Sequence, residues 1–412
     1  MWVSGFSLFA LLLAFLSIPA YADSSLNGSV RATYWSSSRD FGTQQNLLTN
    51  ALWLKAKSTV AEEASVVLDA WAQDSNVLTD GHITSSLREA YVDIHNESIN
   101  VKVGRQIIPW GRADAINPTD NLTPKDFTRL VVGSNDQREG VASINATYQK
   151  NVYSFSVIML PEFRPDVVPL PTSSGLNFKE MLPSKPVRQW ALKIDSSGED
   201  VDWSVSYFDG LDLTPDLRYV DTDMKGINIL LEHHRLKVLG ADFATTFGPY
   251  GLRGEVAYTM TENSNGSDPA IKKPFVFGVI GLERSFLDYL NVNIQYFHRK
   301  VFNYQDPTIL IDPAARAIAI QQGIQNNQLD RTSNGIAARI SYKWLNETLE
   351  AEMTTGYSLN RHDYFISPKV NYSINDYWHA YIGADLFRGT NTGNFGRLRD
   401  NSTAYVEIRR TF

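Results

Sequence analysis

The stretch VDWSVSYF at residues 201–208 decides the fold class, because large apolar side chains alternate in it with small or acidic polar ones. Neighbouring side chains of a β-strand point to opposite faces, so one face of this strand is apolar and the other is polar. A strand that separates lipid from water needs this division. The stretch therefore predicts a strand at the boundary between an apolar medium and water.

The same two-residue period recurs along the chain, in segments that begin near residues 190, 290, 336, 349 and 378. A soluble β-sandwich also alternates, but its strands are usually shorter than the roughly 10 residues that such segments span. The length of the segments therefore favours strands that cross a membrane over strands of a sandwich.

Short and long connections alternate between these segments. Long polar connections cover residues 106–137, 161–186, 209–223, 262–273 and 299–332. Tight turns are predicted at residues 96–97, 150–151, 197–198, 288–289, 346–347 and 375–376. Short periplasmic turns and long external loops are typical of outer-membrane barrels.

The number of strands follows from the requirement that both chain ends lie in the periplasm. A simple count of the predicted strands gives an odd number, which would place the two chain ends on opposite sides of the membrane. The number becomes even when residues 227–247 form one long bent strand before a turn at residues 248–251. The prediction is an all-β fold, a transmembrane antiparallel barrel of about 18 strands with one inward-folded loop. A barrel of that size encloses an aqueous channel.

Both ends of the chain carry export signals. Residues 6–20 form an apolar run that ends in Ala20-Tyr21-Ala22, which predicts a signal peptide over residues 1–22 and a barrel over residues 23–412. The run is shorter than the ~20 residues of a membrane-spanning helix, so a retained anchor is the weaker alternative. The last strand ends in Phe412 and resembles the signal that the bacterial barrel-assembly machinery recognises. We therefore expect an outer-membrane protein, exported through the periplasm, in contact with lipid and lipopolysaccharide.

Composition excludes several classes of function. With 0 Cys among 412 residues, disulfide scaffolds, thiolate metal sites and catalytic cysteines are excluded. The net charge of -7 argues against a nucleic-acid partner, which needs a basic surface. A mean hydropathy of -0.24, with no apolar run after residue 22, excludes helical membrane spans.

Catalytic motifs are absent from the sequence. It contains no Gly-x-Ser-x-Gly elbow and no His-Glu-x-x-His helix. His233 and His234 are adjacent, but on a strand their rings point to opposite faces and cannot bind one metal ion. We therefore predict no catalytic residue, no metal and no cofactor, and keep a barrel enzyme only as an alternative.

The connection over residues 106–137 is the most unusual part of the chain, because Pro, Gly, Asn and Asp recur in it closely enough to fix its backbone. By its position it corresponds to the loop that narrows the channel of general porins. Its charges could face one another across a constriction and create a transverse field. Alternatively they pair to fix the loop, or face solvent. The candidate constriction residues are Arg105, Gln106, Arg112, Asp114, Asp120, Lys125, Asp126, Arg129 and Arg138.

A resemblance is carried by Gly104-Arg105-Gln106, Trp110-Gly111, and Asn117-Pro118 with Asp120. These residues resemble the signature of a porin-like family of uncharacterised proteobacterial outer-membrane barrels, which is similar in architecture to alginate-export porins. The specific match covers residues 101–141. It implies a porin-like architecture in which Arg105, Gln106 and Trp110 occupy positions of the family motif.

Strand phase identifies side chains that should face the lumen. The main candidates are Lys102, Glu89, Arg339, Glu350 and Glu352, and we expect the last three to form ion pairs on adjacent strands. Further bases in this phase are Arg31, Lys55, Lys57, Lys193, Arg253, Lys343 and Lys369. The further acids are Asp69, Asp93, Glu255, Glu283, Asp385 and Glu407. Neither sign dominates, so ion selectivity does not follow.

A helix is predicted over residues 312–320, with Asp312 as its N-cap and Pro313 in its first turn. It lies within a long external loop. It could cover the channel mouth as a lid, or pack on neighbouring loops as a surface helix.

These features together predict a channel through which small hydrophilic or amphipathic solutes diffuse. The alternatives are an export pore for a polysaccharide or another secreted product, and an outer-membrane enzyme.

Overall fold

The structure is a computed structural model that describes residues 24–37, 46–78, 81–114, 116–170, 175–198, 200–287 and 289–412. The predicted signal peptide at residues 1–22 and the turn residue Asp288 lie outside the described residues.

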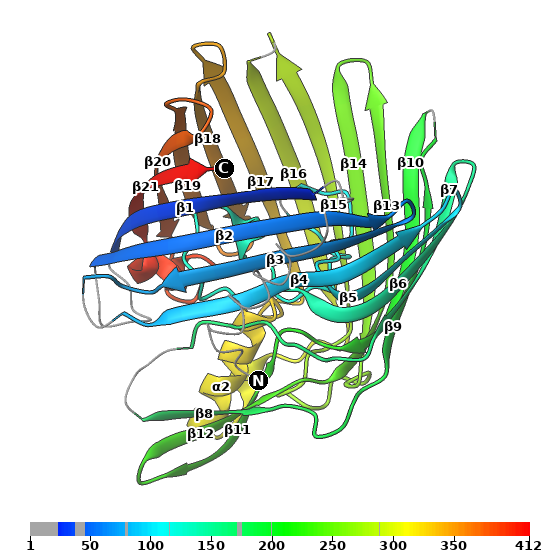
Figure 1. Cartoon of the computed structure of the whole chain (residues 1–412). Coiled ribbons are helices and arrows are strands. Elements are labelled where there is room, and N and C mark those ends of the chain that lie inside the picture. Colours follow the sequence, from blue (N-terminus) through cyan, green and yellow to red (C-terminus); the bar gives the residue numbers. More distant parts are fainter. Residues whose placement is uncertain are drawn as a thin grey trace.

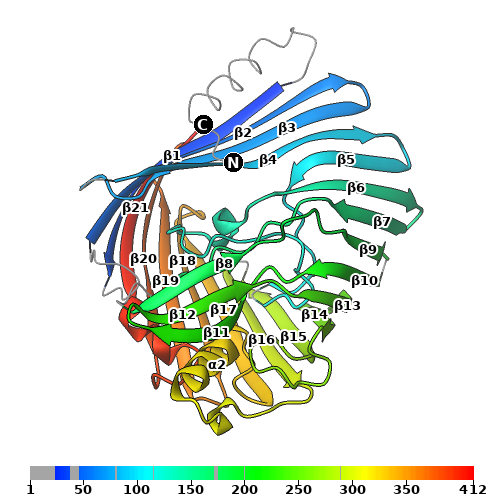
Figure 2. The same cartoon turned by 90° about the horizontal axis from the view of Figure 1, so that it is seen from below.

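Eighteen strands form one sheet that closes on itself, and all of its neighbouring strands are antiparallel (Figures 1 and 2). The predicted fold class and strand number are therefore confirmed. The barrel strands are β1 (Ser24–Ser37), β2 (Asn46–Ala61), β3 (Ala64–Asp74), β4 (Ile83–His95), β5 (Ile99–Gln106), β6 (Val141–Lys150), β7 (Tyr153–Leu160), β9 (Gln189–Ser196), β10 (Val201–Leu211), β13 (Arg235–Phe247), β14 (Tyr250–Thr261), β15 (Phe275–Phe286), β16 (Leu290–Val301), β17 (Thr332–Trp344), β18 (Leu349–Ser358), β19 (Asp363–Ser373), β20 (Trp378–Arg388) and β21 (Thr403–Thr411).

The seam of the barrel joins the first strand to the last. Ser29 pairs with Thr411, and the register continues to Ser37, which pairs with Thr403. The backbone of Phe412 extends the seam, because its carbonyl accepts from the Gly28 N–H at 2.8 Å and its N–H donates to the Gly28 carbonyl at 3.1 Å. The barrel sheet, as far as the structure describes it, therefore has no open edge strand.

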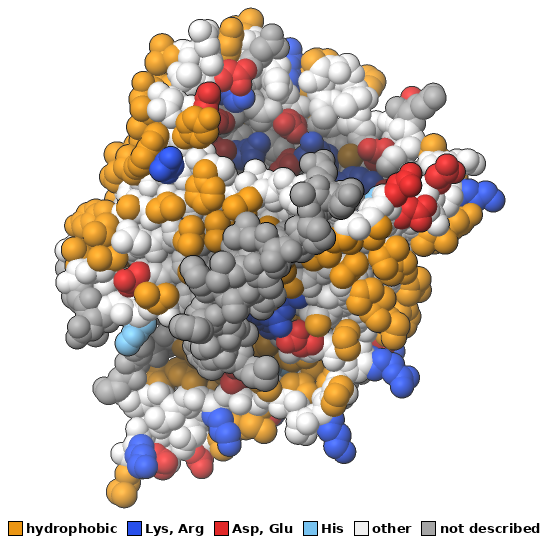
Figure 3. Space-filling view, viewed as in Figure 1, with side chains coloured by type: hydrophobic (Ala, Val, Ile, Leu, Met, Phe, Trp, Pro, Cys, Tyr) orange, Lys and Arg blue, Asp and Glu red, His pale blue; other side chains and the backbone are white. Residues whose placement is uncertain are grey.

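The barrel is apolar outside and polar inside. In β10, Val205 is 43% exposed on the outer face, whereas its neighbours Ser204 and Ser206 are 1% and 6% exposed within the barrel. Hydrophobic side chains cover the outer surface, while charged side chains gather in the hollow at the top (Figure 3). The alternation in the sequence therefore marks the two faces of the wall.

The two ends of the barrel differ. Short connections such as residues 248–249, 345–348 and 374–377 lie at one end, which we call the turn end. The long connections lie at the other, the loop end, and carry η1 (Ser134–Gln137), η2 (Pro307–Ile309), η3 (Gly396–Asn401) and the helix α2 (Pro313–Gln325). No helix in the described ranges is long and apolar enough to cross a membrane.

A second, three-stranded sheet lies outside the barrel at the loop end, below it in Figure 1. It consists of β8 (Leu176–Met181), β11 (Asp216–Asp223) and β12 (Gly226–Glu232). The prediction of one bent strand over residues 227–247 is therefore wrong: β12 pairs with β8 and β11, and only β13 enters the barrel. Ile229 and Leu231 cause the separation, because they pack on Leu217 and Ile318 instead of facing lipid.

The predicted helix is confirmed and continues beyond residue 320 to Gln325. The Asp312 carboxylate accepts from the N–H groups of Ala314 and Ala315, as expected of an N-cap. Ile318 packs into the apolar cluster of the small sheet, so α2 is held against neighbouring loops.

Candidate functional site

The connection between β5 and β6, residues 107–140, folds into the barrel (Figure 2), and we call it the inserted loop. Its entry is fixed by a hydrogen bond from the Ile107 N–H to a Glu89 carboxylate oxygen at 3.1 Å. Thr123 then ties the loop to itself, because its hydroxyl accepts from the Ile108 N–H at 2.8 Å and donates to the Ile108 carbonyl at 3.0 Å. The loop is therefore a compact body within the lumen.

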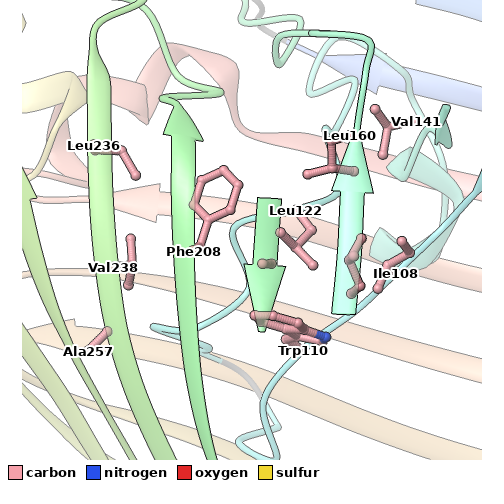
Figure 4. Packing of buried hydrophobic residues seen from close by; sticks show 11 residues of the cluster. Ile108, Trp110, Leu122, Val141, Leu160, Phe208, Leu236, Val238 and Ala257 are labelled. Carbon is pink, nitrogen blue, oxygen red and sulfur yellow. The ribbon is translucent and has the colours of Figure 1, made fainter. Parts of the chain in front are cut away.

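An apolar cluster holds the inserted loop against one side of the wall (Figure 4). The loop contributes Ile108, Trp110 and Leu122, which are 7%, 7% and 2% exposed. The wall contributes inward apolar side chains of β6, β7, β9, β10, β13 and β14, namely Val141, Ile158, Leu160, Ala191, Phe208, Leu236, Val238 and Ala257. Burial of a large apolar side chain contributes about 1.5–3 kcal/mol, so this cluster is a main source of the loop's stability.

Arg112 anchors the inserted loop to the acidic part of the wall. Its guanidinium contacts Asp195 of β9 at 3.0 Å and forms a second ion pair with Asp242 of β13. Burial lowers the pKa of Arg112, but its hydrogen bonds and ion pairs with Asp242 and Asp195 outweigh burial and raise that pKa overall. Arg112 is therefore charged at every pH at which the fold exists.

Glu255 of β14 anchors the same side through the loop backbone. Its carboxylate accepts from the Thr119 N–H at 2.6 Å, from the Thr119 hydroxyl at 2.8 Å and from the Ala113 N–H at 3.3 Å. Next to it, Asp114 accepts from Arg253 at 2.5 Å. The loop thus provides N–H and hydroxyl donors for the buried Glu255 carboxylate, and the wall in turn provides a cation for Asp114.

The opposite side of the inserted loop contacts basic side chains of β1 and β4. Asp136 pairs with Arg31 at 2.6 Å and lies 3.9 Å from Arg88. Arg88 also donates to the carbonyls of Asn135 at 3.0 Å and Arg138 at 3.1 Å. The loop is therefore braced across the lumen by ion pairs at both of its sides.

Several charges of the inserted loop pair with one another. Asp120 accepts from Arg138 at 2.6 Å and lies 3.4 Å from Lys125, and Arg129 forms an ion pair with Glu139. These pairs agree with the alternative in which the charges fix the loop. Each of these pairs still carries a dipole within the lumen.

The inserted loop leaves two cavities beside it. One, of about 620 Å³, lies toward β2, β3 and β4. Eight hydroxyl and amide side chains line it, together with charged residues of both signs, Lys125, Arg129, Arg164, Asp126 and Glu139. The other, of about 780 Å³, lies between the loop and the wall of β15 to β19, and η3 also lines it. We call the second cavity the bore.

The wall of the bore changes character along its depth. Toward the loop end, the strand registers place Phe297 opposite Gly335, and Phe365 opposite Gly356. Thr354 lies two residues from Gly356 toward the turn end, and Arg339 lies opposite it. Arg299 lies two residues beyond Phe297 toward the loop end and also lines the bore, so the phenyl rings lie between two levels of positive charge.

The predicted constriction residues divide between two places. Arg112, Asp114, Asp120, Lys125, Asp126, Arg129 and Arg138 belong to the inserted loop. Gln106 is 2% exposed and donates to the Ser143 hydroxyl at 2.9 Å, so it ties β5 to β6. Arg105 pairs with Glu162 of the β7–β9 connection at 3.3 Å.

The predicted wall residues are paired differently from our expectation. Glu352 pairs with Lys369 at 2.9 Å, and Arg339 forms no ion pair within the described ranges. The expected cluster of Arg339, Glu350 and Glu352 is therefore absent there, because the register places Lys369, not Arg339, beside Glu352. Elsewhere on the wall, Glu89 pairs with Lys55 at 3.0 Å, and Lys102 lies 3.9 Å from Asp93.

Two groups of functional residues were missed from the sequence. Arg88 faces inward together with Glu89, because a register shift between Asp69 and Ala70 interrupts the alternation there. The inward phenylalanines of β15, β16 and β19 were missed because an aromatic residue on a predicted membrane strand is expected to face lipid.

The described part of the chain contains histidines both inside and outside the barrel, and His82 lines the cavity beside β2, β3 and β4. No group of three or more His, Cys, Asp or Glu among the described residues could hold a metal ion. His233 and His234 lie outside the barrel between β12 and β13, where they contact the Asp212 carbonyl at 2.8 Å and the Asp216 carboxylate at 3.0 Å.

Comparison with known proteins supports this architecture. Residues 12–412 match the family described as "Protein of unknown function (DUF1302)". The crystal structure of Acinetobacter baumannii OccAB3 is similar, with a TM-score of 0.56, 12% identity, and coverage of 95% of this chain and 99% of that chain. The crystal structure of Pseudomonas aeruginosa OccK11 is also similar, with a TM-score of 0.53, 10% identity, and coverage of 95% of this chain and 96% of that chain. No curated protein matches. At these identities the likeness concerns the fold.

Proposed function

This chain belongs to the DUF1302 family, and we propose that it is an outer-membrane channel through which small hydrophilic or amphipathic solutes diffuse down their gradients. The observation that carries the proposal is the bore, a cavity of about 780 Å³ left open inside a closed barrel. A barrel of this strand number is wide enough to enclose an aqueous path. The inserted loop narrows that path without filling it.

Charge along the path supports selection among solutes. The inserted loop presents Arg112 toward the acids of β9 and β13, and Asp136 toward the bases of β1 and β4. Opposite charges on two sides of a narrow passage create a field that orients polar solutes. Of the predicted constriction residues, Asp114 lines the bore, and we assign Arg112, Asp120, Arg129 and Arg138 to the charged body of the inserted loop beside it.

Cysteine accessibility tests the position of the path, because the natural chain contains 0 Cys. Thr354 lines the bore, whereas its neighbour Met353 is 39% exposed on the outer face. A charged methanethiosulfonate reagent should change the single-channel current of Thr354→Cys and leave that of Met353→Cys unchanged. Absence of any current, or equal responses of both variants, would contradict the proposal.

A further inference from the structure

The bore combines aromatic and cationic side chains in a way that a simple water-filled pore does not need. Five phenylalanines line it, together with three arginines and two acids. The phenylalanines are Phe127, Phe277, Phe297, Phe365 and Phe395.

Four of the phenyl rings contact one another in two pairs, Phe277 with Phe297 and Phe365 with Phe395, and glycines beside two of the rings leave room for them. A Cβ at Gly335 would lie 2.1 Å from the Phe297 ring, and a Cβ at Gly356 would lie 2.4 Å from the Phe365 ring. Each ring therefore lies along the wall over the neighbouring strand. The rings of Phe365 and Phe395 are 5.1 Å apart, so this pair joins the wall to the η3 loop.

The charges of the bore favour an anion. Both acids that line it already have cationic partners, because Asp114 pairs with Arg253 at 2.5 Å and Glu352 pairs with Lys369 at 2.9 Å. Arg339, in contrast, is exposed in the bore and forms no ion pair among the described residues. Its guanidinium is therefore available to a carboxylate or a similar group.

The other two arginines add to the positive charge of the bore. Arg299 donates to the Asn326 carbonyl at 2.7 Å and lies over the Phe277 ring at 4.3 Å. Arg397 donates to the Asn394 carbonyl at 3.3 Å. Asp363 lies near Arg397 and offsets part of its charge, but the two form no ion pair among the described residues, and one Asp363 oxygen accepts from the N–H groups of Phe395 and Gly396.

We propose that the bore is a binding site for an amphipathic anion, whose apolar body lies on the phenylalanine rings and whose anionic group reaches Arg339 and Arg397. The strand registers place Ala337 opposite Gly356, and Gly356 opposite Phe365. Arg339 lies two residues further along β17 than Ala337, which corresponds to about 7 Å along the strand. That spacing suits a phenyl or short alkyl body joined to a carboxylate by a few methylene groups. The inference rests on the proposed channel function and specifies the solutes that the channel retains.

Block of the potassium chloride current in planar bilayers tests the site, with 4-phenylbutyrate as the probe. The controls are 4-phenylbutylammonium, which has the body but the opposite charge, and acetate, which has the charge but no body. We expect 4-phenylbutyrate to block at a concentration about tenfold lower than either control. Equal block by the anion and the cation would overturn the proposal.

Substitutions locate the site. Arg339→Gln combined with Arg397→Gln should raise the blocking concentration of 4-phenylbutyrate about tenfold, and Phe365→Leu should raise it severalfold. Arg388→Gln is the matched control. Arg388 is an exposed arginine at the loop end of the barrel, as Arg397 is, but it does not line the bore. Unchanged block in the double variant would overturn the site.

The outcome separates the two proposals. A current that 4-phenylbutyrate does not block refutes the binding site alone. If the protein carries no current, the channel function is refuted, and equilibrium dialysis of radiolabelled 4-phenylbutyrate against the protein in lipid nanodiscs decides the binding site. Binding that is lost in the double variant supports the site, and absence of binding overturns it.

Discussion

Arg112→Ala tests whether the inserted loop controls the channel. The substitution leaves Asp242 buried, with a side chain only 2% exposed, and without its cationic partner. Loss of one partner of a buried ion pair costs about 3–5 kcal/mol, and the 19% exposure of Arg112 places this pair at the lower end, about 3 kcal/mol. The loop should then detach from the wall about 100-fold more often, since about 1.4 kcal/mol corresponds to tenfold.

Single-channel recording measures this detachment directly. We expect brief transitions to a higher conductance that are about 100-fold more frequent than in the natural protein. Full release is not expected, because Trp110, Thr119 and Asp136 still hold the loop. Arg361→Ala is the control, because Arg361 pairs with Asp330 at 2.6 Å in external loops away from the lumen. A current trace of Arg112→Ala that matches the natural protein would refute the role of the loop.

Two further predictions concern the apolar cluster and the external region. Trp110→Ala removes a ring that is 7% exposed and should lower the free energy of unfolding by about 3 kcal/mol. On semi-native gels the folded band of the variant should be lost at a lower temperature. Trp378→Ala, which removes a lipid-facing ring, is the control. The hydrogen bond that the His234 ring donates to the Asp216 carboxylate raises the pKa of His234. The pair therefore stabilises the external region fully below about pH 6.5, and this stabilisation is lost as pH rises through the raised pKa. Proteolysis near α2 should therefore be faster at high pH, and His234→Asn, which should be cut equally fast at both pH values, is the check.

Much of the barrel could be predicted because lipid imposes a strict pattern on its outer face. Val205, Ile294 and Ile382 face lipid as their alternation indicated, at 43%, 50% and 57% exposure. The pattern fails where both faces of a strand contact protein. β12 alternates like a barrel strand, yet its apolar face covers α2 and β11 in a separate sheet.

The lumen was harder to predict than the wall, because its contacts depend on how the inserted loop folds back. The composition of the loop indicated order, but the pairing of Arg112 with Asp195 and Asp242 joins residues that are 83 and 130 positions apart. Periodicity within a strand carries no information about such contacts. Arg88 illustrates a second limit, since one register shift in β3 and β4 reverses the face that its position indicates.

The seam between β1 and β21 has a consequence for assembly. It joins Ser29 to Thr411 across nearly the whole chain, and closing a flexible chain of that length costs about 5 kcal/mol of entropy. The pairings between barrel strands that follow one another along the chain share that cost, because they bring the two ends together before the ladder from Ser29 to Ser37 closes the sheet. The cylinder therefore completes itself last at its own two ends, and a chain that lacks its final residues would remain an open, aggregation-prone sheet.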